Sequence, residues 1–348
     1  MNKYWILRSK KISFLLDKRV FFLTLLLCII TILVMIVSSS VGELHIPPLE
    51  AAKTLFGFGS EMNETVIQKF RLPRILIAFI AGASLALSGA ILQGVIRNPL
   101  ASPDMIGIST GAGFAAVTFI TMFSNKSNAL TVSIHYLPVF AFIGATIAAL
   151  FIYFLAWKKG VSPTRLVLIG IGLMAAFQAL TTLMIILGPI YAASQATIWL
   201  TGSVNGVSWQ DVNGLLPWFI LSLPVLAVLV RRLNVQELGD ELSTGLGVNT
   251  NRERFLFLMI CTALAGSAVA FSGAIGFVGL IGPHIARRLV GSSFGGLLPV
   301  SGLIGGLIVL IADLAGRTLF SPLEVPAGVF TAAVGAPYFL YLLFKTNG

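Results

Sequence analysis

Charged residues are scarce in this 348-residue sequence. Asp, Glu, Lys and Arg together make up 10% of it, whereas a soluble domain carries about 25%, and the mean hydropathy is +0.95. This composition excludes an ordinary soluble fold and is typical of a polytopic membrane protein. We therefore expect an all-α membrane protein, whose length allows about ten membrane-spanning helices with short loops.

Residues that form disulfides or bind metals are also few. The two cysteines, Cys28 and Cys261, both lie within apolar runs, so we expect no disulfide framework and no metal site. Of the three histidines, His45 and His135 lie in predicted polar loops, and His284 has no histidine, cysteine or carboxylate close to it in the sequence. We interpret His284 as a packed structural residue, and we predict no cofactor.

Catalytic signatures are missing too. The sequence has no G-x-x-x-x-G-K-[ST] loop to hold nucleotide phosphates, so ATP hydrolysis would need a separate subunit. Gly82-Ala-Ser84 and Ser88-Gly89 are similar to sequences of intramembrane serine proteases, but the candidate partner His284 falls near a membrane end and not in a facing span. A secondary transporter, the alternative of a different class, would need carboxylates in mid-membrane, whereas Asp104 and Asp313 fall near span ends. We predict that the chain is not an enzyme.

Long apolar runs are what the sequence has in abundance. Together they predict one transmembrane domain over residues 1–348, with spans at residues 21–39, 75–96, 104–123, 137–157, 164–187, 212–230, 255–271, 297–315 and 328–344, and a short glycine-rich segment at 273–290. A short surface helix is expected within residues 41–69, and an interfacial helix and turn within 188–211.

The basic residues are distributed unevenly between the two ends of these spans. Seventeen of the 23 Lys and Arg lie in the N-terminal tail or in one alternate set of connecting segments. Because cytoplasmic loops carry an excess of basic residues, we predict that this set and both termini are cytoplasmic. The acidic segment 41–69 is then outside, and the first span is an uncleaved helix.

One stretch, residues 71–113, is the predicted centre of the fold. It opens with Arg71-Leu-Pro-Arg74, and proline suits the first turn of a helix. Small residues then recur every four positions, at Ala78, Gly82, Ala86, Ala90 and Gly94. Such a stripe lets other helices approach closely, so this span is expected to be buried inside the bundle.

The sequence also contains a weak internal repeat. Ala86-Leu-Ser-Gly-Ala-Ile91 recurs as Ala270-Phe-Ser-Gly-Ala-Ile275, and the same offset relates Gly82 to Gly266 and Pro99 to Pro283. The two copies lie five crossings apart, so they would run in opposite directions. We predict a possible inverted repeat, a plan that many transporters use.

The central stretch resembles one family in particular. Arg71-Leu-Pro-Arg74, Ser88-Gly89, Gln93, Arg97-Asn-Pro-Leu-Ala101, Pro103 and Gly107-Ile-Ser-Thr-Gly-Ala112 are similar to the signature of the iron–siderophore and cobalamin permeases of ABC importers, the FecCD-type transmembrane subunits. Trp199-Leu-Thr-Gly-Ser203 and residues 273–287 extend the resemblance. The segment Pro322-Leu-Glu-Val-Pro326 is most similar to the ferric dicitrate and hydroxamate members.

This resemblance implies a type II ABC importer permease in the bacterial cytoplasmic membrane. Two permease chains, identical or paralogous, would enclose a pore lined by the spans at 164–187 and 328–344. Two ATPase subunits would bind inside, and a substrate-binding protein would dock outside. The expected cargo is a ferric siderophore, and a cobalamin or haem permease of the same architecture is the alternative.

The resemblance also implies three sets of functional residues. Residues 233–254 form the longest polar inner segment, and within it we expect a helix that couples to the ATPase, at Glu237, Leu238, Gly239, Asp240, Glu241, Gly245, Leu246 and Gly247. Ser162, Pro163 and Thr164 match the inner gate. Arg71, Arg74 and Arg317 match the arginines that receive the binding protein, the alternatives being interface anchoring for Arg71 and Arg74 and an Asp313–Arg317 pair.

Overall fold

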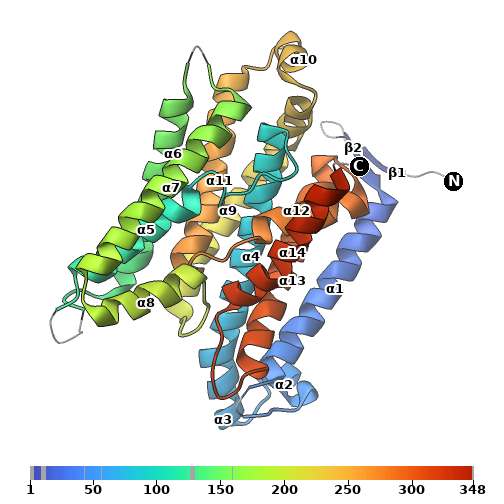
Figure 1. Ribbon diagram of the computed structural model, residues 1–348. Coiled ribbons are helices and arrows are strands. Elements are labelled where there is room, and N and C mark those ends of the chain that lie inside the picture. The colour runs from blue at the N-terminus through green and yellow to red at the C-terminus, as the bar shows by residue number, and fades with distance from the viewer. Residues whose placement is uncertain are drawn as a thin grey trace.

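The chain forms a helical bundle with a small N-terminal hairpin (Figure 1). The computed structural model describes residues 4–8, 13–42, 44–55, 57–125, 130–158 and 160–346. The hairpin pairs β1 (Tyr4–Arg8) with β2 (Ser13–Asp17) in antiparallel fashion. The α-helices are α1 (Lys18–Ser40), α2 (Pro48–Leu55), α3 (Glu61–Glu64), α4 (Leu72–Ile96), α5 (Ile108–Met122), α6 (Leu137–Ala156), α7 (Pro163–Leu187), α8 (Ile190–Thr201), α9 (Trp209–Glu237), α10 (Asp240–Gly245), α11 (Thr250–Ser272), α12 (Val278–Val290), α13 (Phe294–Thr318) and α14 (Ala327–Thr346).

The helices agree with the predicted membrane class. Within the described ranges, seven helices are long and apolar enough to cross a membrane: α1, α4 with the turns before it, α6, α7, α9, α11 and α13. The other predicted segments are the shorter helices α5, α12 and α14. The all-α fold is therefore confirmed, with the N-terminal hairpin as an unpredicted addition.

Helix α4 occupies the centre of the bundle, as predicted. In its most apolar window, 89% of the residues are buried, against 6% for α1. Its small residues permit direct backbone contact with α12 and α13. A Cβ atom added at Gly89 would lie 1.8 Å from the Gly279 carbonyl oxygen, and one at Gly82 would lie 2.3 Å from that of Gly305. Gly82 of the stripe and Gly89 next to it thus hold neighbouring backbones at distances that only glycine allows.

Several helix ends differ from the sequence-based boundaries. The span predicted from residue 104 begins as a helix only at Ile108, because Gly107 takes a left-handed conformation with φ +84°. Helix α9 is longer than predicted at both ends. It starts in a capping box formed by Ser208 and Asp211, and it continues past residue 230 because the following residues are mostly good helix formers.

Helices α4 and α11 pack against each other in opposite directions. The Ser88 hydroxyl donates to the Cys261 carbonyl at 3.1 Å, and Arg97 just after α4 shares an ion-pair partner with Arg254 at the start of α11. This antiparallel arrangement is what an inverted repeat requires. The common register ends near Ser272, where α11 stops, whereas α4 continues beyond the corresponding Ser88 to Ile96.

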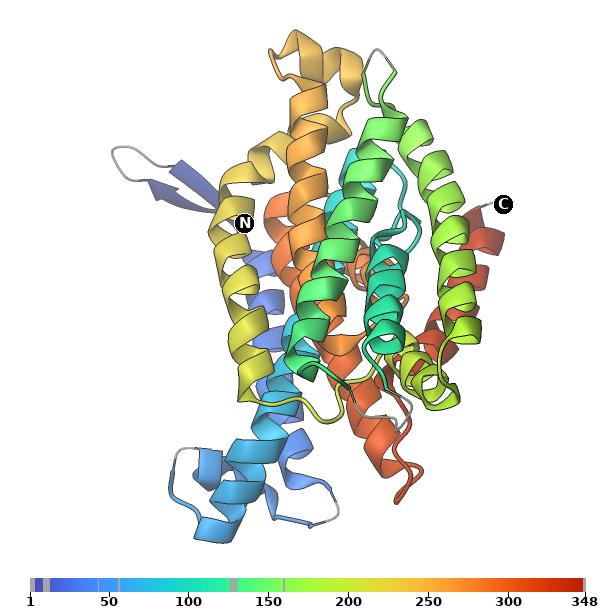
Figure 2. The same cartoon turned by 90° about the vertical axis from the view of Figure 1, so that its left-hand side faces the viewer.

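The bundle has two distinct ends. Helix α10 lies at one of them, here named the α10 end, and α2 and α3 lie at the other, named the α3 end (Figure 1). Strand β1 and the last turn of α14 both lie toward the α10 end. Figure 2 shows α6, α11 and α9 side by side, with α10 above them and α2 and α3 below.

Candidate functional site

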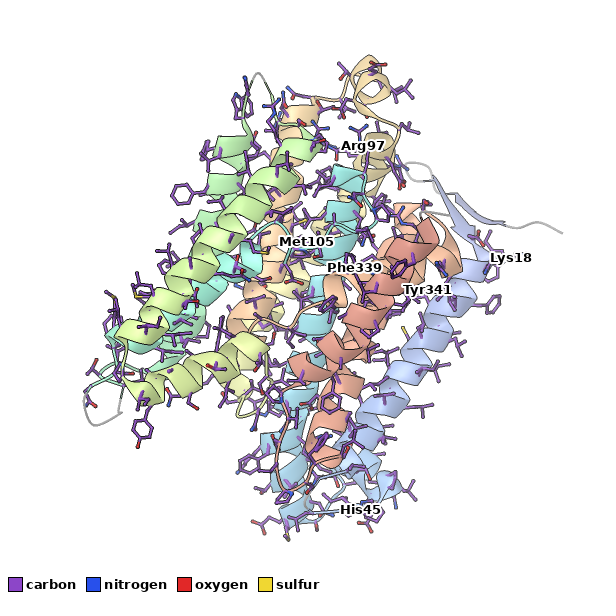
Figure 3. All side chains as sticks on the ribbon, viewed as in Figure 1. Lys18, His45, Arg97, Met105, Phe339 and Tyr341 are labelled. Atoms are coloured by element: carbon purple, nitrogen blue, oxygen red, sulfur yellow. The ribbon has the colours of Figure 1, made fainter. Side chains whose placement is uncertain are left out.

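A cavity of about 760 Å³ lies between α5, α7, α12 and α14. Helix α7 contributes Met174, Gln178, Thr181, Thr182 and Ile185 to its wall, and α14 contributes Phe339. These are the two spans that the sequence predicted to line a pore. Figure 3 labels Met105 and Phe339, two of the lining residues, midway between the two ends of the molecule.

The connection before α5 forms another part of the wall, which the sequence reasoning missed. Asp104 is buried there, and the Ser109 hydroxyl donates to its carboxylate at 2.6 Å. The backbone N–H of Phe277 donates to the same carboxylate, although Phe277 has a left-handed φ of +67° that is unusual for a residue other than glycine. The family-like string at residues 97–112 was the only signal for this wall.

The cavity wall is nearly free of charge. Among the described residues that line it there is no Lys, Arg or His, and Asp104 is the single carboxylate. Gln178 and Thr182 are exposed on α7 between apolar neighbours. Polar side chains of this kind are poorly suited to contact with lipid. This face is therefore better suited to line an aqueous path or a subunit interface.

A network of ion pairs links several helices at the α10 end. The Asp240 carboxylate pairs with Arg254 at 2.6 Å and with Arg97 at 2.8 Å, and Glu237 pairs with Arg287 at 2.7 Å. Partial burial alone would raise the pKa of Asp240, but the hydrogen bond and charge of Arg254, together with the charge of Arg97, lower it below its ordinary value. Asp240 is therefore ionised at neutral pH.

The predicted coupling segment is a short helix between two left-handed glycines. Glu237 ends α9, Gly239 has φ +107°, and α10 covers only Asp240–Gly245 before Gly247 at φ +79°. The continuous helix expected over residues 237–247 is thus wrong, because Gly239 breaks it. Leu238, Leu242 and Leu246, spaced by four, are 57%, 61% and 64% exposed. The sequence reasoning missed Leu242, which this spacing could have revealed.

The predicted gate residues lie at the start of α7. Ser162 precedes the helix in an extended conformation and Pro163 is its first residue. The neighbouring Val161 is held on both sides by the start of α11. Its N–H donates to the Asn251 side-chain oxygen at 3.0 Å, and its carbonyl accepts from Arg254.

Arg74, at the α3 end, is saturated by carboxylates of its own chain. Its Nε and Nη2 atoms bind Asp313 in a fork at 2.8–3.1 Å. Its Nη1 atom pairs at 3.0 Å with Glu324 in the loop between α13 and α14.

Arg71 and Arg317 tie down the end of α1. The buried Arg71 guanidinium donates to the carbonyls of Ser39, Ser40 and Leu44. Arg317 donates to the carbonyl of Val41 at 2.9 Å and to Ser38, while Asp313 lies 3.9 Å from its Nε atom. The predicted pairing of Asp313 and Arg317 is present at that distance, but Asp313 binds Arg74 more closely.

Residues 29–345 of this chain match one protein family, the FecCD transport family. The chain belongs to the FecCD transport family. The match spans nearly all of the bundle and excludes only the hairpin, the first half of α1 and the last residues.

Individual relatives agree with this membership. The chain is 54% identical over 331 residues to the siderophore transport system permease protein YfhA of Bacillus subtilis, covering 95% of this chain and 96% of the relative. It is 47% identical to the achromobactin transport system permease protein CbrC of Dickeya dadantii, covering 91% and 89%. A solved metal-chelate type ABC transporter in an inward-facing conformation is 30% identical, covers 94% of this chain and 99% of its own, and superposes with a TM-score of 0.81.

Proposed function

We propose that this chain is the membrane-spanning permease subunit of an ABC importer that moves a ferric siderophore across the bacterial cytoplasmic membrane. The observation that carries the proposal is the cavity between α7 and α14, in a member of the FecCD transport family whose relatives are described as siderophore and Fe(3+)-citrate permeases.

The exposed faces of α7 and α14 support pairing with a second permease chain, identical or paralogous. Leu180, Leu183 and Ile186 on α7 and Val334 and Leu340 on α14 are exposed, around a wall that carries Gln178 and Thr182. Symmetric association would close the open side of the cavity. The cavity would then form half of a translocation path.

The α10 end is the cytoplasmic end in this proposal. Basic residues gather there, as the positive-inside rule requires: Arg97, Lys158, Arg165, Arg231, Arg232, Arg252, Arg254, Arg287 and Arg288. Leu242 on α10, with Leu238 and Leu246 just before and after this helix, would insert into a groove of the ATPase subunit, since exposed apolar side chains of a short helix are typical docking anchors. Residues 162–164 would form the inner gate.

The α3 end would then receive the substrate-binding protein. Arg71, Arg74 and Arg317 remain the predicted docking residues. In the free chain these arginines bind internal acceptors, so docking by an acidic partner would compete with those contacts. Arg74 is the best placed of the three because its partner Glu324 is 39% exposed.

Uptake of radiolabelled iron in a deletion strain tests the function. A strain that lacks this gene should lose uptake of one ferric siderophore within a panel and regain it with the wild-type gene. Uptake of labelled cobalamin or haem instead would overturn the cargo, and uptake that persists without a functional ATPase subunit would overturn the class.

Substitution of Leu242 by Ser tests ATPase docking. The docking surface should lose the one exposed leucine that lies on α10, so the ATPase should no longer co-purify with the permease. Leu319→Ser is a matched control, because Leu319 is 68% exposed but lies near the α3 end. Equal recovery of the ATPase with both variants would contradict docking at α10.

A further inference from the structure

Arg254 contacts two segments at the α10 end, which are helix α10 and the connection between α6 and α7. It lies in the first turns of α11 and is only 5% exposed. Its Nη2 atom donates to Asp240, the first residue of α10, at 2.6 Å. Its Nη1 atom donates to the carbonyl of Val161 in the α6–α7 connection. One guanidinium thus bridges two segments that lie about eighty residues apart in the chain.

Both backbone polar groups of Val161 are hydrogen-bonded to the start of α11. Asn251, one turn earlier on α11, accepts from the Val161 N–H at 3.0 Å. Val161 leads directly into Ser162 and Pro163, where the proline ring restricts both residues. A displacement of Val161 therefore reaches the first turn of α7 with little loss, and α7 forms the longest part of the cavity wall.

The structure assigns Arg254 as a positioning residue that transmits the movement of α10 to the start of α7. This inference rests on the proposed function. When the ATPase subunits displace α10, the planar fork of Arg254 carries Asp240 and the Val161 carbonyl together. Its Nε atom is buried without a partner in the described part of the chain, so it is free to take up a hydrogen bond in the displaced state.

Arg254 could act only through its charge on Asp240, and experiment can distinguish that role from the proposed bridge between Asp240 and Val161. Arg97 also pairs with Asp240, at 2.8 Å, but among the described residues it has no hydrogen bond to the α6–α7 connection. Loss of Arg97 would weaken the charge balance at Asp240 but leave the bridge to Val161 intact. A lysine at position 254 would keep the charge but could not reach both acceptors as a fork does.

The test uses the complete importer in proteoliposomes, with its ATPase and binding protein. We expect R254K to insert and hydrolyse ATP at the wild-type basal rate but to import about tenfold less cargo per ATP, a typical size for loss of coupling between sites. R97Q, which removes the charge of Arg97 from Asp240 but leaves the bridge to Val161 in place, should lower this ratio less than R254K. R252Q, which alters an exposed arginine of the same helical turn, should match the wild type.

A distance measurement keeps the inference falsifiable if R254K fails to assemble. Spin labels at the exposed positions Glu241 and Thr164, each paired with a label on the α3 end, report the movement of α10 and of the α7 start. Both distances should change when ATP is added to the wild-type importer, and in R254K only the α10 distance should change.

Two results would overturn the inference: a wild-type cargo-to-ATP ratio in R254K, or an α7 start that stays fixed in the wild type while α10 moves. A wild-type importer that carries no ferric siderophore would instead overturn the proposed function.

Discussion

Arg74 at the α3 end forms an internal ion pair with Glu324 and is also the proposed docking residue for the binding protein. Substitution of Glu324 distinguishes these two roles. This carboxylate occupies the Nη1 side of Arg74 at 3.0 Å, where an acidic partner protein would bind. In E324Q we expect the binding protein to associate severalfold faster at low ionic strength, because rim charges act mainly on association rate. Surface plasmon resonance on the permease in nanodiscs measures this rate.

The control for this prediction is E61Q, which removes an exposed carboxylate from the same end. It changes the net charge equally but leaves Arg74 occupied. The rate difference between E324Q and E61Q should shrink in high salt, because salt screens exposed charges. Identical rates for the two variants at low salt would show that Arg74 is not a docking residue.

Asp240 gives a pH prediction whose sign follows from its lowered pKa. A carboxyl whose pKa is lower in the folded state contributes stability above its unfolded pKa of about 3.9, and loses it as pH falls through the folded value. The difference in thermal stability between wild type and D240N should therefore be constant from about pH 8 to pH 5 and vanish on further acidification.

Calorimetry of both proteins in the same detergent checks this dependence. A difference that already disappears between about pH 8 and pH 6 would mean that another group, not the Asp240 carboxylate, controls the network.

Residue-level contacts were the least predictable part of the site. The charge pattern placed Arg71 at the end opposite the segment of residues 233–254, where it lies in the structure, but it did not reveal that the acceptors of Arg71 are backbone carbonyls of Ser39, Ser40 and Leu44. Every residue has a carbonyl, so sequence alone gives no sign of which ones are used. Glu324 was not singled out because its partner, Arg74, lies 250 residues away.

At the scale of elements, the close packing of α4 predicts that its glycines tolerate no side chain. A Cβ atom at Gly89 would lie 1.8 Å from backbone oxygen of α12, which no rotamer change can relieve. We expect G89A to destabilise the permease by about 1–3 kcal/mol, the usual range for overpacking. Thermal unfolding in detergent measures the loss.

Gly172 provides the matched control on another helix. A Cβ atom there meets nothing within 4 Å, and alanine favours the helix more than glycine does. G172A should therefore be neutral or slightly stabilising. A G89A protein as stable as G172A would mean that α12 can move away from α4.

The helices themselves were largely predictable, because apolar length and small-residue spacing are local patterns. The ends were less so. Gly107 and Gly239 both interrupt helices through left-handed conformations, and glycine alone does not say whether it will break a helix or pack within it, as Gly82 and Gly89 do. The N-terminal hairpin gave no signal among the basic residues of the tail.

At the scale of the whole molecule, the exposed faces of α7 and α14 predict how two permease chains meet. With the native Cys28 replaced by serine, L183C should form a dimer with a short thiol-reactive cross-linker in membranes. I147C should not, although Ile147 on α6 is 45% exposed and Leu183 is 46% exposed. Gel electrophoresis after cross-linking separates the two outcomes. Dimers from I147C alone would place the interface on α6.

Helix α1 differs from every other long helix in its burial, since only 6% of its most apolar window is buried. Lipid tails are as apolar as leucine, so exchange of one aliphatic residue for another at the exposed positions of α1 should change stability little. Its apolar contacts with the bundle follow one side, where Leu27 and Val34 pack against the core, and its last turn adds polar contacts between Ser38, Ser39 and Ser40 and the side chains of Arg71 and Arg317. Among descendants of one ancestral gene, the outer surface of α1 should drift almost freely while its terminal serines stay fixed.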